Sequence, residues 1–484
     1  MEHIRTRFAP SPTGYMHIGN LRTALYAYLI AKKDPEGKFL MRIEDTDQGR
    51  LVEGATDIIY ETMKQCGLKH DEGPDIGGPV GPYVQSERVK IGLYMKYARE
   101  LVHRGGAHYC FCDEEEIQAQ RSEDGDSFKF VDPCRNLTIE EAEKRIENGE
   151  KFVIRQTIPS EGTTTFQDEV FGSITVENNT LDEQVLIKSD GFPTYNFANV
   201  IDDHLMGITD VVRGMEYLSS APKYNLLYES FGWNIPRYIH CPPVMKDEHN
   251  KLSKRNGDAS FQDLVAKGYL PGAILNYIAL LGWAPETNQE LYTLDELVQA
   301  FNVKRINTSG AIFDPVKLTS INGLWLRNMS LDEYYELAEP YIAQAVKGNY
   351  DLKKIAAICQ VRANTLNEIP EMLDFFDEFP HYDISLYNHK KMKTNPEIAL
   401  KSLQAAGALL ETLDTWDHDT LHDRLMELPA QLEMKNGQLL FPLRLAITGK
   451  QSTPGGAIEI AEILGKEETL RRLNLSIQQL KDAQ

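Results

Sequence analysis

A short segment near the start of the chain carries residues that could hold the phosphates of a nucleotide. Ser11–Asn20 lies between a predicted strand and a predicted helix and contains Gly14, His17 and Gly19. A helix N-terminus presents free N–H groups and a positive dipole to an anion. The glycine spacing resembles that of a P-loop, but the Lys-Ser/Thr pair of that motif is missing. Because His17 alone is also compatible with an ordinary turn, the segment needs a second element to be interpreted.

A second candidate lies far along the chain, in the cationic sequence Lys251-Leu-Ser-Lys254-Arg255. Two lysines in a loop can meet a triphosphate, although such a loop is by itself more typical of a solvated basic turn. It precedes a helix predicted to begin near Ser260, with a possible cap. Together with the segment around His17, this loop predicts a two-sided clamp for ATP.

A third group of residues could bind a metal. Three of the six cysteines cluster in the sequence: Cys110, Cys112 and Cys134. Three thiolates supply three of the four ligands of a tetrahedral zinc site. The position two after the last cysteine, which holds His or Cys in the clearest zinc-binding pattern, is Asn136, and neither His108 nor Asp132 stands out as a replacement. Two interpretations stay open: zinc with an undetermined fourth ligand, or a set of reduced cysteines.

Composition restricts the class of protein. A chain of 484 residues that is 42% hydrophobic can bury several cores, and about 150 residues per domain predicts roughly three or more domains. The formal net charge of −21 argues against indiscriminate binding to nucleic acid, but not against a selective RNA enzyme. The N-terminal sequence has no apolar export segment, and the longest apolar stretch, Tyr269–Trp283, is too short and interrupted to cross a bilayer. We therefore expect a soluble, cytoplasmic protein.

The elements that must position these residues follow from periodicity. His3–Phe8 alternates as a strand does, Leu21–Leu29 places leucines on one helical face, and Lys38–Ile43 predicts a second strand. This strand–helix–strand order is typical of an α/β unit with a parallel sheet. The first domain is therefore predicted to be Rossmann-like.

The chain then changes character twice. Residues 106–195 contain short β-branched runs separated by turns, which predicts an inserted α+β domain. Ile208–Val212 and Ala221–Phe231 predict a strand and a helix of the returning α/β domain. From residue 331 onward, stretches such as Pro396–Leu413 are helical in period. The predicted divisions are 1–105, 106–195, 196–257, 258–330 and 331–484, with the first and third forming one split α/β domain and the last all-α.

The two nucleotide segments resemble the signatures of the class I aminoacyl-tRNA synthetases, His-Ile-Gly-His and Lys-Met-Ser-Lys-Ser. This chain has His17-Ile-Gly-Asn20 and Lys251-Leu-Ser-Lys-Arg255, so both depart from the family pattern. Within that class, the chain is similar to the bacterial glutamyl-tRNA synthetases over nearly its whole length. The segments that carry this similarity are Arg7–Gly14, Met41–Asp47 and Asp190–Asp203.

The resemblance implies an enzyme that attaches L-glutamate to tRNA(Glu) through a glutamyl-adenylate, for protein synthesis. It implies ATP with Mg²⁺, a monomer, and activation of glutamate only when tRNA is bound. It also assigns the insertion to the tRNA acceptor stem, residues 258–330 to further contact with the stem, and residues 331–484 to the anticodon. Some family members carry zinc in the insertion.

The roles of the family's pocket residues carry over to two sets of positions. The resemblance implies a glutamate pocket lined by Arg7, Ser11, Glu44, Tyr195, Asn199 and Arg213. It implies an ATP site formed by His17, Gly19, Asn20, Glu216, Lys251 and Lys254, with His17, Lys251 and Lys254 in the catalytic role on the phosphates. These residue types suit glutamate, because arginine forks bind carboxylates and Glu44 can pair with an ammonium. The alternatives are a structural ion pair between Arg7 and Glu44 and a surface position for Arg213.

Other functions fit the sequence less well. A glutamine-specific relative would carry β-barrels at the C-terminus, where this chain is predicted to be helical. A tRNA-modifying paralogue would lack the anticodon-binding region, and a small-molecule nucleotidyltransferase would have no need of it. A non-catalytic RNA-binding paralogue would have lost nucleotide-binding residues such as His17 and Lys251, which are present. Whether tRNA(Gln) is also charged, and which residues read the anticodon, stay open.

Overall fold

The structure, a computed structural model, describes residues 3–113, 115–118, 130–252 and 260–483. The chain forms two compact units. Unit 1 comprises Met1–Val265 with Pro271–Pro315, and unit 2 comprises Ala266–Leu270 with Val316–Gln484. Within the described ranges, no helix is both long and apolar enough to span a membrane.

Unit 1 is an α/β structure with several small sheets. Its strands are β1 (Arg5–Phe8), β2 (Lys38–Met41), β3 (Ala107–Cys110), β4 (Val153–Gln156), β5 (Thr163–Asp168), β6 (Gly172–Glu177), β7 (Val185–Ile187), β8 (Asp210–Gly214), β9 (Arg237–Cys241), β10 (Val244–Met245) and β11 (Ala311–Ile312). Its helices are mainly α1 (Ile18–Lys32), α2 (Ala55–Gln65), α3 (Gln85–Lys90), α4 (Leu93–His103), α6 (Ile139–Glu147), α7 (Tyr195–Leu205), α8 (Ala221–Phe231), α9 (Phe261–Ala266), α10 (Pro271–Leu280) and α11 (Leu294–Ala300).

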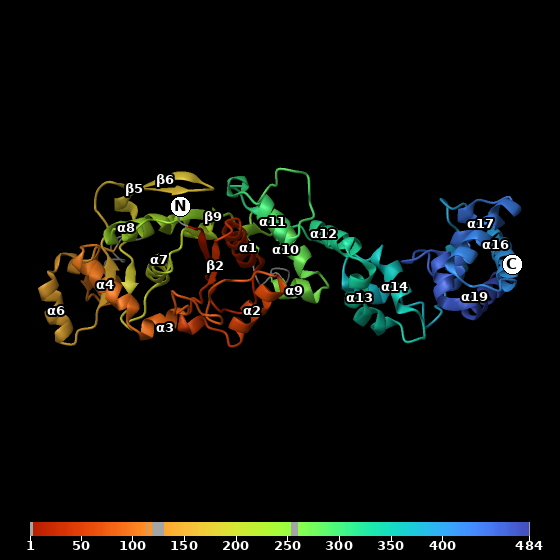
Figure 1. Cartoon of the computed structure of the whole chain (residues 1–484), viewed down its shortest axis with the longest axis horizontal. Coiled ribbons are helices and arrows are strands. Elements are labelled where there is room, and N and C mark those ends of the chain that lie inside the picture. Colours follow the sequence, from red (N-terminus) through yellow and green to blue (C-terminus); the bar gives the residue numbers. More distant parts are fainter. Residues whose placement is uncertain (1–2, 114, 119–129, 253–259, 484) are drawn as a thin grey trace. The chain divides into compact units, whose positions relative to one another are not determined.

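The first strand–helix–strand unit forms as predicted. β1 and β2 pair in parallel, with Phe8 opposite Met41, and α1 packs against both strands (Figure 1). Leu21, Leu25 and Leu29, the predicted apolar face of α1, are all buried. The chain therefore emerges from β1 directly toward the N-terminus of α1, where the predicted nucleotide segment lies.

The α/β pattern returns after the insertion and joins the first half. β8 and β9 pair in parallel, with Arg213 opposite His240. The backbone N–H of Thr209 donates to the carbonyl of Arg5, and the N–H of Arg5 donates to the Thr209 hydroxyl, both at 2.9 Å. Two segments about 200 residues apart in sequence thus close into one split domain.

The inserted segment contributes to two sheets. β3, β4 and β7 form an antiparallel sheet in the order β3-β4-β7. The β5–β6 hairpin instead extends the sheet of the second half, in the order β6-β5-β9-β8, because Asp168 pairs with Tyr238 (Figure 1). The insertion contains strands and helix, as the sequence predicts, and the five-part division of the chain stays a prediction.

Unit 2 is helical. It is built from α12 (Pro315–Asn328), α13 (Leu331–Ala345), α14 (Leu352–Gln360), α15 (Ile369–Met372), α16 (Pro396–Glu411), α17 (His418–Gln431), α18 (Asn436–Thr448) and α19 (Ala457–Asp482). Residues 331–483, all described, contain no β-strand, which confirms the predicted all-α region. The buried Arg472 of α19 donates to the carbonyls of Phe375 and Ile447 and so ties three segments together. α19 bends at Gly465, where φ is 78°.

A buried carboxylate fixes α7 in unit 1. Asp202 accepts hydrogen bonds from the Arg88 guanidinium at 3.0 Å, the Tyr94 hydroxyl at 2.9 Å and the Gln85 amide at 2.8 Å. All four side chains are buried. Since Gln85 and Arg88 belong to α3 and Tyr94 to α4, this one carboxylate holds α7 against both helices.

Replacing Asp202 by alanine should destabilise unit 1 strongly. The change leaves Arg88 buried without its carboxylate, which typically costs about 3–5 kcal/mol. Glu100→Ala is the matched control, because it removes an exposed ion pair with Arg104, for which we expect a loss below about 1 kcal/mol. Urea denaturation, with hydrogen exchange to assign the transition to unit 1, measures both. Equal losses would contradict the role given to Asp202.

Candidate active site

A cavity of about 520 Å³ opens at the carboxyl ends of β1, β8 and β9, beside the N-terminus of α1. Ligands of parallel α/β sheets bind at this edge. The lining includes most of the residues singled out in the sequence: Arg7, Ser11, His17, Gly19, Asn20, Glu44, Tyr195, Arg213, Glu216 and Lys251. Asn199 is buried and does not line the cavity. Lys254 lies outside the described residues.

His17 connects the two predicted nucleotide segments. It caps α1, with Nδ1 accepting a hydrogen bond from the N–H of Gly19 at 3.0 Å. Its Nε2 lies 3.2 Å from the carbonyl of Leu252, the residue after Lys251. A carbonyl only accepts, so Nε2 donates this bond while Nδ1 accepts from Gly19. The imidazole therefore holds the start of α1 and the second segment together on one side of the cavity.

Gly19 suits this arrangement because it has no side chain. A Cβ built on Gly19 would lie 3.0 Å from Nδ1 of His17, closer than ordinary contacts allow. A larger residue would press on the imidazole that caps the helix. The glycine of the His-Ile-Gly element thus protects the position of its histidine.

Arg7 is held by a buried carboxylate. Its Nε and Nη2 donate to the two oxygens of Asp203 at 2.9 and 3.2 Å, and its Nη1 donates to the carbonyl of Val212 at 3.2 Å. Asp203 also accepts from Arg42 at 2.7 Å. Burial would raise the pKa of Asp203, but Arg7 and Arg42 outweigh burial and hold that pKa below its ordinary value. Arg7 therefore has a fixed orientation and a compensated charge.

Glu44 pairs with Arg42 rather than with Arg7. One of its carboxylate oxygens accepts from both Nε and Nη2 of Arg42, at 3.2 and 2.8 Å. Burial raises the pKa of Glu44, and the positive charges of Arg42 and Arg7 offset part of that rise. The alternative in which Arg7 and Glu44 form a direct structural ion pair is therefore wrong, and Glu44 keeps one oxygen for the cavity that it lines.

Arg213 is buried at the cavity wall, which excludes the surface position. Its guanidinium carbon lies 4.5 Å from the ring centroid of Tyr224 and 5.4 Å from that of Tyr238. Its Nη1 lies 3.5 Å from the Asn199 side-chain oxygen. Within the described part of the chain, no carboxylate lies within ion-pair distance of this guanidinium. A buried cation held by aromatic faces and one amide is suited to an anionic ligand.

Asn199 and Tyr195 form a second layer on this wall. The side-chain N–H of Asn199 donates to the carbonyl of Tyr195 at 2.8 Å, so its oxygen is turned toward Arg213. The ring of Tyr195 stacks on Tyr217, with centroids 5.0 Å apart. Asn199 therefore contacts the residues of the pocket rather than the cavity itself.

Sequence reasoning missed several residues that hold the cavity's charged groups: Arg42, Asp203, Tyr217, Tyr224 and Tyr238. Arg42 and Asp203 lie inside segments that carry the family resemblance. Buried arginines need carboxylate partners, so a search for compensating charges within those segments would have found both. The three tyrosines have no feature in the sequence that would identify them, because only the fold brings them to the guanidinium of Arg213.

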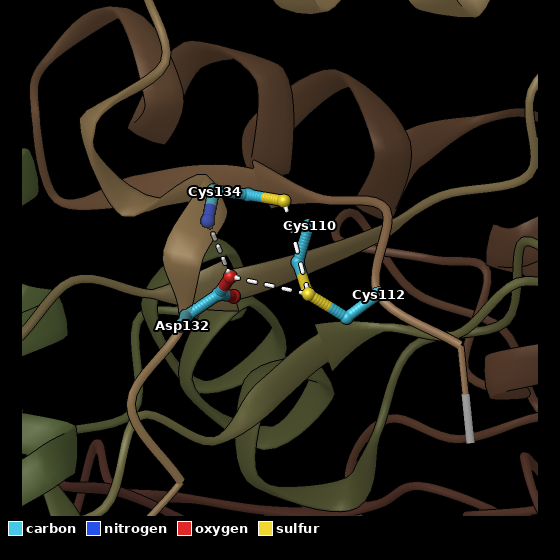
Figure 2. A group of neighbouring side chains, drawn as sticks. All are labelled: Cys110, Cys112, Asp132 and Cys134. Atoms are coloured by element: carbon cyan, nitrogen blue, oxygen red, sulfur yellow. Dashed lines mark hydrogen bonds between the residues drawn. The ribbon is translucent and has the colours of Figure 1, made fainter. Parts of the chain in front are cut away.

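The three clustered cysteines meet a fourth donor (Figure 2). The ligand atoms of Cys110, Cys112, Asp132 and Cys134 all lie within 4.8 Å of one another. Sγ of Cys112 lies 3.9 Å from Sγ of Cys134 and 3.8 Å from Oδ1 of Asp132. Zinc–sulfur bonds of about 2.3 Å in a tetrahedron place sulfurs about 3.8 Å apart. Asp132, which does not stand out in the sequence, therefore lies where a fourth donor would be needed.

Asp132 reaches the cysteines because it caps the short helix that carries Cys134. Its Oδ1 accepts from the N–H of Cys134 at 2.9 Å. Its Oδ2 lies 3.1 Å from Nε2 of His108. His108 thus holds one oxygen of the carboxylate and leaves the other facing the sulfurs, an arrangement that orients a metal ligand.

Two protein-family models match this chain, one over its N-terminal two thirds and one over its C-terminal third. Residues 3–320 match the family of the class I tRNA synthetases (E and Q), catalytic domain. Residues 333–477 match the family of the anticodon binding domain. These matches confirm the predicted catalytic fold and the predicted helical anticodon-binding region.

Individual relatives are similar over their whole length. A glutamate–tRNA ligase of Clostridium tetani is 60% identical over 99% of this chain and 98% of its own, and that of Clostridium novyi is 58% identical over 100% and 99%. A crystal structure of a glutamate tRNA ligase from Elizabethkingia meningosepticum, in complex with its amino acid, matches with a TM-score of 0.88 at 35% identity. That match covers 99% of this chain and 100% of the other.

Asp203→Asn should lower stability in a pH-dependent way. A carboxylate whose pKa is lowered in the folded state stabilises the fold above its unfolded pKa, and this contribution is lost as pH falls through the folded pKa. Because the pKa of Asp203 lies below its ordinary 3.8, we expect the variant to be less stable than the wild type at neutral pH. The difference should stay constant down to about pH 5 and shrink below about pH 4.

Thermal unfolding across this pH series measures the difference. Asp190→Asn is the control, since Asp190 is an exposed carboxylate in the same segment of the chain, and it should show little difference at any pH. A loss in Asp203→Asn that grows as the pH falls would contradict the role of Asp203 as an ionised partner of Arg7 and Arg42.

Proposed function

This chain belongs to the class I tRNA synthetases for glutamate and glutamine, and from that membership we propose that it activates L-glutamate with ATP and transfers it to tRNA(Glu). The named relatives that match along the full chain are glutamate–tRNA ligases. The helical region after residue 331 also supports this over the glutamine-specific alternative, for which β-barrels are expected. The enzyme would supply glutamyl-tRNA for protein synthesis.

The observation that carries the choice of glutamate is the buried Arg213. Near the pocket, Arg7 and Arg42 are balanced by Asp203 and Glu44. Arg213 has no carboxylate partner of this kind among the described residues. An uncompensated buried charge is costly, and the side-chain carboxylate of glutamate removes that cost. Glutamine brings an uncharged amide and would leave the guanidinium uncompensated.

The remaining pocket residues suit the rest of the substrate. Glu44 would receive the α-ammonium on its free oxygen. Arg7 would donate hydrogen bonds rather than net charge, because Asp203 already compensates it. Ser11 and Tyr195 line the same space and would complete the pocket. Arg213 completes the proposed glutamate site, and Asn199 would support it from behind through its contact with Arg213.

The proposed reaction has two steps. The α-carboxylate of glutamate attacks the α-phosphorus of ATP, which forms the glutamyl-adenylate and releases pyrophosphate. A terminal ribose hydroxyl of tRNA then attacks the carbonyl of this mixed anhydride and releases AMP. No nucleophile from the protein is needed, so positioning and charge stabilisation account for the catalysis.

We assign ATP binding to the two segments joined by His17. The assigned residues are His17, Gly19, Asn20, Glu216, Lys251 and Lys254. Both ring nitrogens of His17 are engaged, by Gly19 and by Leu252. His17 would therefore act by holding the α1 N-terminus against the second segment, while the lysines neutralise phosphate charge. Magnesium bound with the nucleotide supplies further neutralisation of that charge.

The parts of the chain outside the pocket would bind tRNA. The match of residues 333–477 to an anticodon binding domain supports that role for unit 2. We assign residues 106–195 to the acceptor stem and 258–330 to further contact with the stem, and expect the enzyme to act as a monomer.

We also propose that the cysteine cluster binds zinc. Three thiols and a carboxylate at the spacing described are the donor set and geometry of a closed tetrahedral site. With four protein ligands the metal would be structural. It would fix the end of β3, which carries Cys110, to the turn that carries Asp132 and Cys134.

Replacing Arg213 by glutamine should abolish most glutamate charging. Loss of a buried charge partner for the substrate carboxylate typically costs about 2–5 kcal/mol, so we expect kcat/KM for glutamate to fall about 30-fold or more. The measurement is formation of aminoacyl-tRNA with ATP, magnesium and labelled glutamate or glutamine, with and without tRNA(Glu).

Arg237→Gln is the matched control, because Arg237 lies on neighbouring β9 with its side chain 54% exposed. The Arg237→Gln variant should charge tRNA(Glu) with the same kcat/KM for glutamate as the wild type. Wild-type charging with glutamine in preference to glutamate would overturn the proposed substrate. A folded chain that binds tRNA(Glu) but charges no tRNA would favour a non-catalytic RNA-binding protein.

The zinc proposal has its own test. We expect the purified chain to carry about one zinc, and Cys112→Ser and Asp132→Asn to lose it more readily to a chelator, because each removes one of four ligands. Asp113→Asn is the control, since that exposed carboxylate bonds to Glu116 instead of joining the cluster. Equal retention of zinc by the wild type and Asp132→Asn would exclude Asp132 as a ligand.

A further inference from the structure

Asp168 and His240 form a buried pair that the proposed reaction does not use. Nδ1 of His240 lies 2.6 Å from Oδ2 of Asp168, and both side chains are fully buried. His240 belongs to β9, at whose carboxyl end the cavity opens, but it does not line the cavity. Asp168 is the last residue of β5, in the inserted segment.

The surroundings of Asp168 fix the orientation of the imidazole. Oδ1 of Asp168 accepts from the backbone N–H groups of Val170 and Phe171, both at 2.9 Å. Oδ2 accepts from the backbone N–H of His240 and faces Nδ1 of the same residue. A carboxylate so placed keeps the hydrogen of the ring on Nδ1. Nε2 is then a bare acceptor, and burial, which lowers the pKa of His240, agrees with a neutral ring.

His240 and Arg213 face the same side of the sheet. They lie opposite each other in the pairing of β8 with β9. The ring of Tyr238 connects their side chains, because its centroid is 5.9 Å from that of His240 and 5.4 Å from the guanidinium carbon of Arg213. Both side chains therefore lie on the face where the proposed glutamate pocket is built.

Each of the two residues leaves one buried polar atom without a partner in the described part of the chain. These atoms are Nε of Arg213 and Nε2 of His240. They are complementary, because the arginine Nε can only donate and the histidine Nε2, with hydrogen on Nδ1, can only accept. Buried polar groups nearly always find partners, either directly or through an ordered water.

We propose that His240 is a positioning residue for Arg213, accepting a hydrogen bond from its Nε–H through one buried water, with Asp168 holding the imidazole in place. The bond would anchor the guanidinium at Nε and turn both Nη groups toward the cavity, where they can meet a carboxylate as a fork. The inference deepens the proposed function, because it rests on Arg213 binding the side-chain carboxylate of glutamate.

Two substitutions at His240 separate this role from simple packing. In His240→Asn the amide can still donate to Asp168, but the acceptor at the Nε2 position is gone. In His240→Gln the longer side chain can return an oxygen to that position. A hydrogen bond to a charged group strengthens the site by more than a neutral one does, so we expect KM for glutamate to rise about tenfold or more in His240→Asn. His240→Gln should recover most of the loss.

The assay is aminoacylation of tRNA(Glu) with glutamate and ATP varied separately. The expected signature is a raised KM for glutamate with an unchanged KM for ATP and a similar kcat. His204→Asn is the matched control, since His204 is a half-buried histidine that stacks on Trp233 and does not line the cavity. Thermal unfolding shows which variants are folded at the assay temperature.

Asp168→Asn tests the same pair without changing the histidine. The two backbone N–H groups at Oδ1 should keep the amide oxygen there and turn the NH₂ group toward His240. The ring hydrogen then moves to Nε2, where it opposes the N–H of Arg213. We again expect a selective rise of KM for glutamate, so the inference can be tested even if His240→Asn does not fold.

The outcomes separate a failure of the positioning role of His240 from a failure of the proposed function. A wild type that does not charge tRNA with glutamate overturns the proposed function. A wild type that charges normally, with folded His240→Asn or Asp168→Asn variants whose KM for glutamate is unchanged, overturns only the positioning role. Falls in kcat and melting temperature without a selective change in that KM would show a packing role and would also overturn the inference.

Discussion

The pocket depends on a buried chain of alternating charges. Glu44 bonds to Arg42, Arg42 to Asp203, and Asp203 to Arg7. Burying any one of these groups alone would be costly, but as a balanced set each supplies the hydrogen bonds that its neighbours need. This series of ion pairs also joins the two halves of the split domain, because Arg42 follows β2 and Asp203 lies on α7. Compensation of these four charges leaves the guanidinium of Arg213 available for the substrate.

The contiguous parts of this site could be predicted from the sequence. Short contiguous motifs identify Arg7, Glu44 and His17. A strand followed by a turn and a helix places such motifs at one edge of a sheet. The partner of each charge could not be predicted in the same way. Asp203 reaches Arg7 across a separation of 196 residues, and only the closure of the split domain brings the two together.

Two differences from the sequence-based expectations have a physical cause. Asn199 was expected to line the glutamate pocket, but its amide is used by the Tyr195 carbonyl and by Arg213, one layer behind the cavity. The clearest zinc-binding pattern would place a fourth donor two residues after Cys134, where this chain has Asn136. In the structure Asp132, two residues before Cys134, joins the thiols instead, because the side chain that caps a helix turns back over the first residues of that helix.

The β5–β6 hairpin belongs in sequence to the insertion and in space to the sheet that carries Arg213. Insertions are often regarded as modules that can be exchanged between relatives. Here an exchange at residues 106 and 195 would also replace two strands of that sheet, β5 and β6, together with Asp168 at the end of β5. Recombination between homologues at these borders would therefore succeed only where the donor's strand fits the recipient's sheet, so this insertion and the domain around it must diverge together.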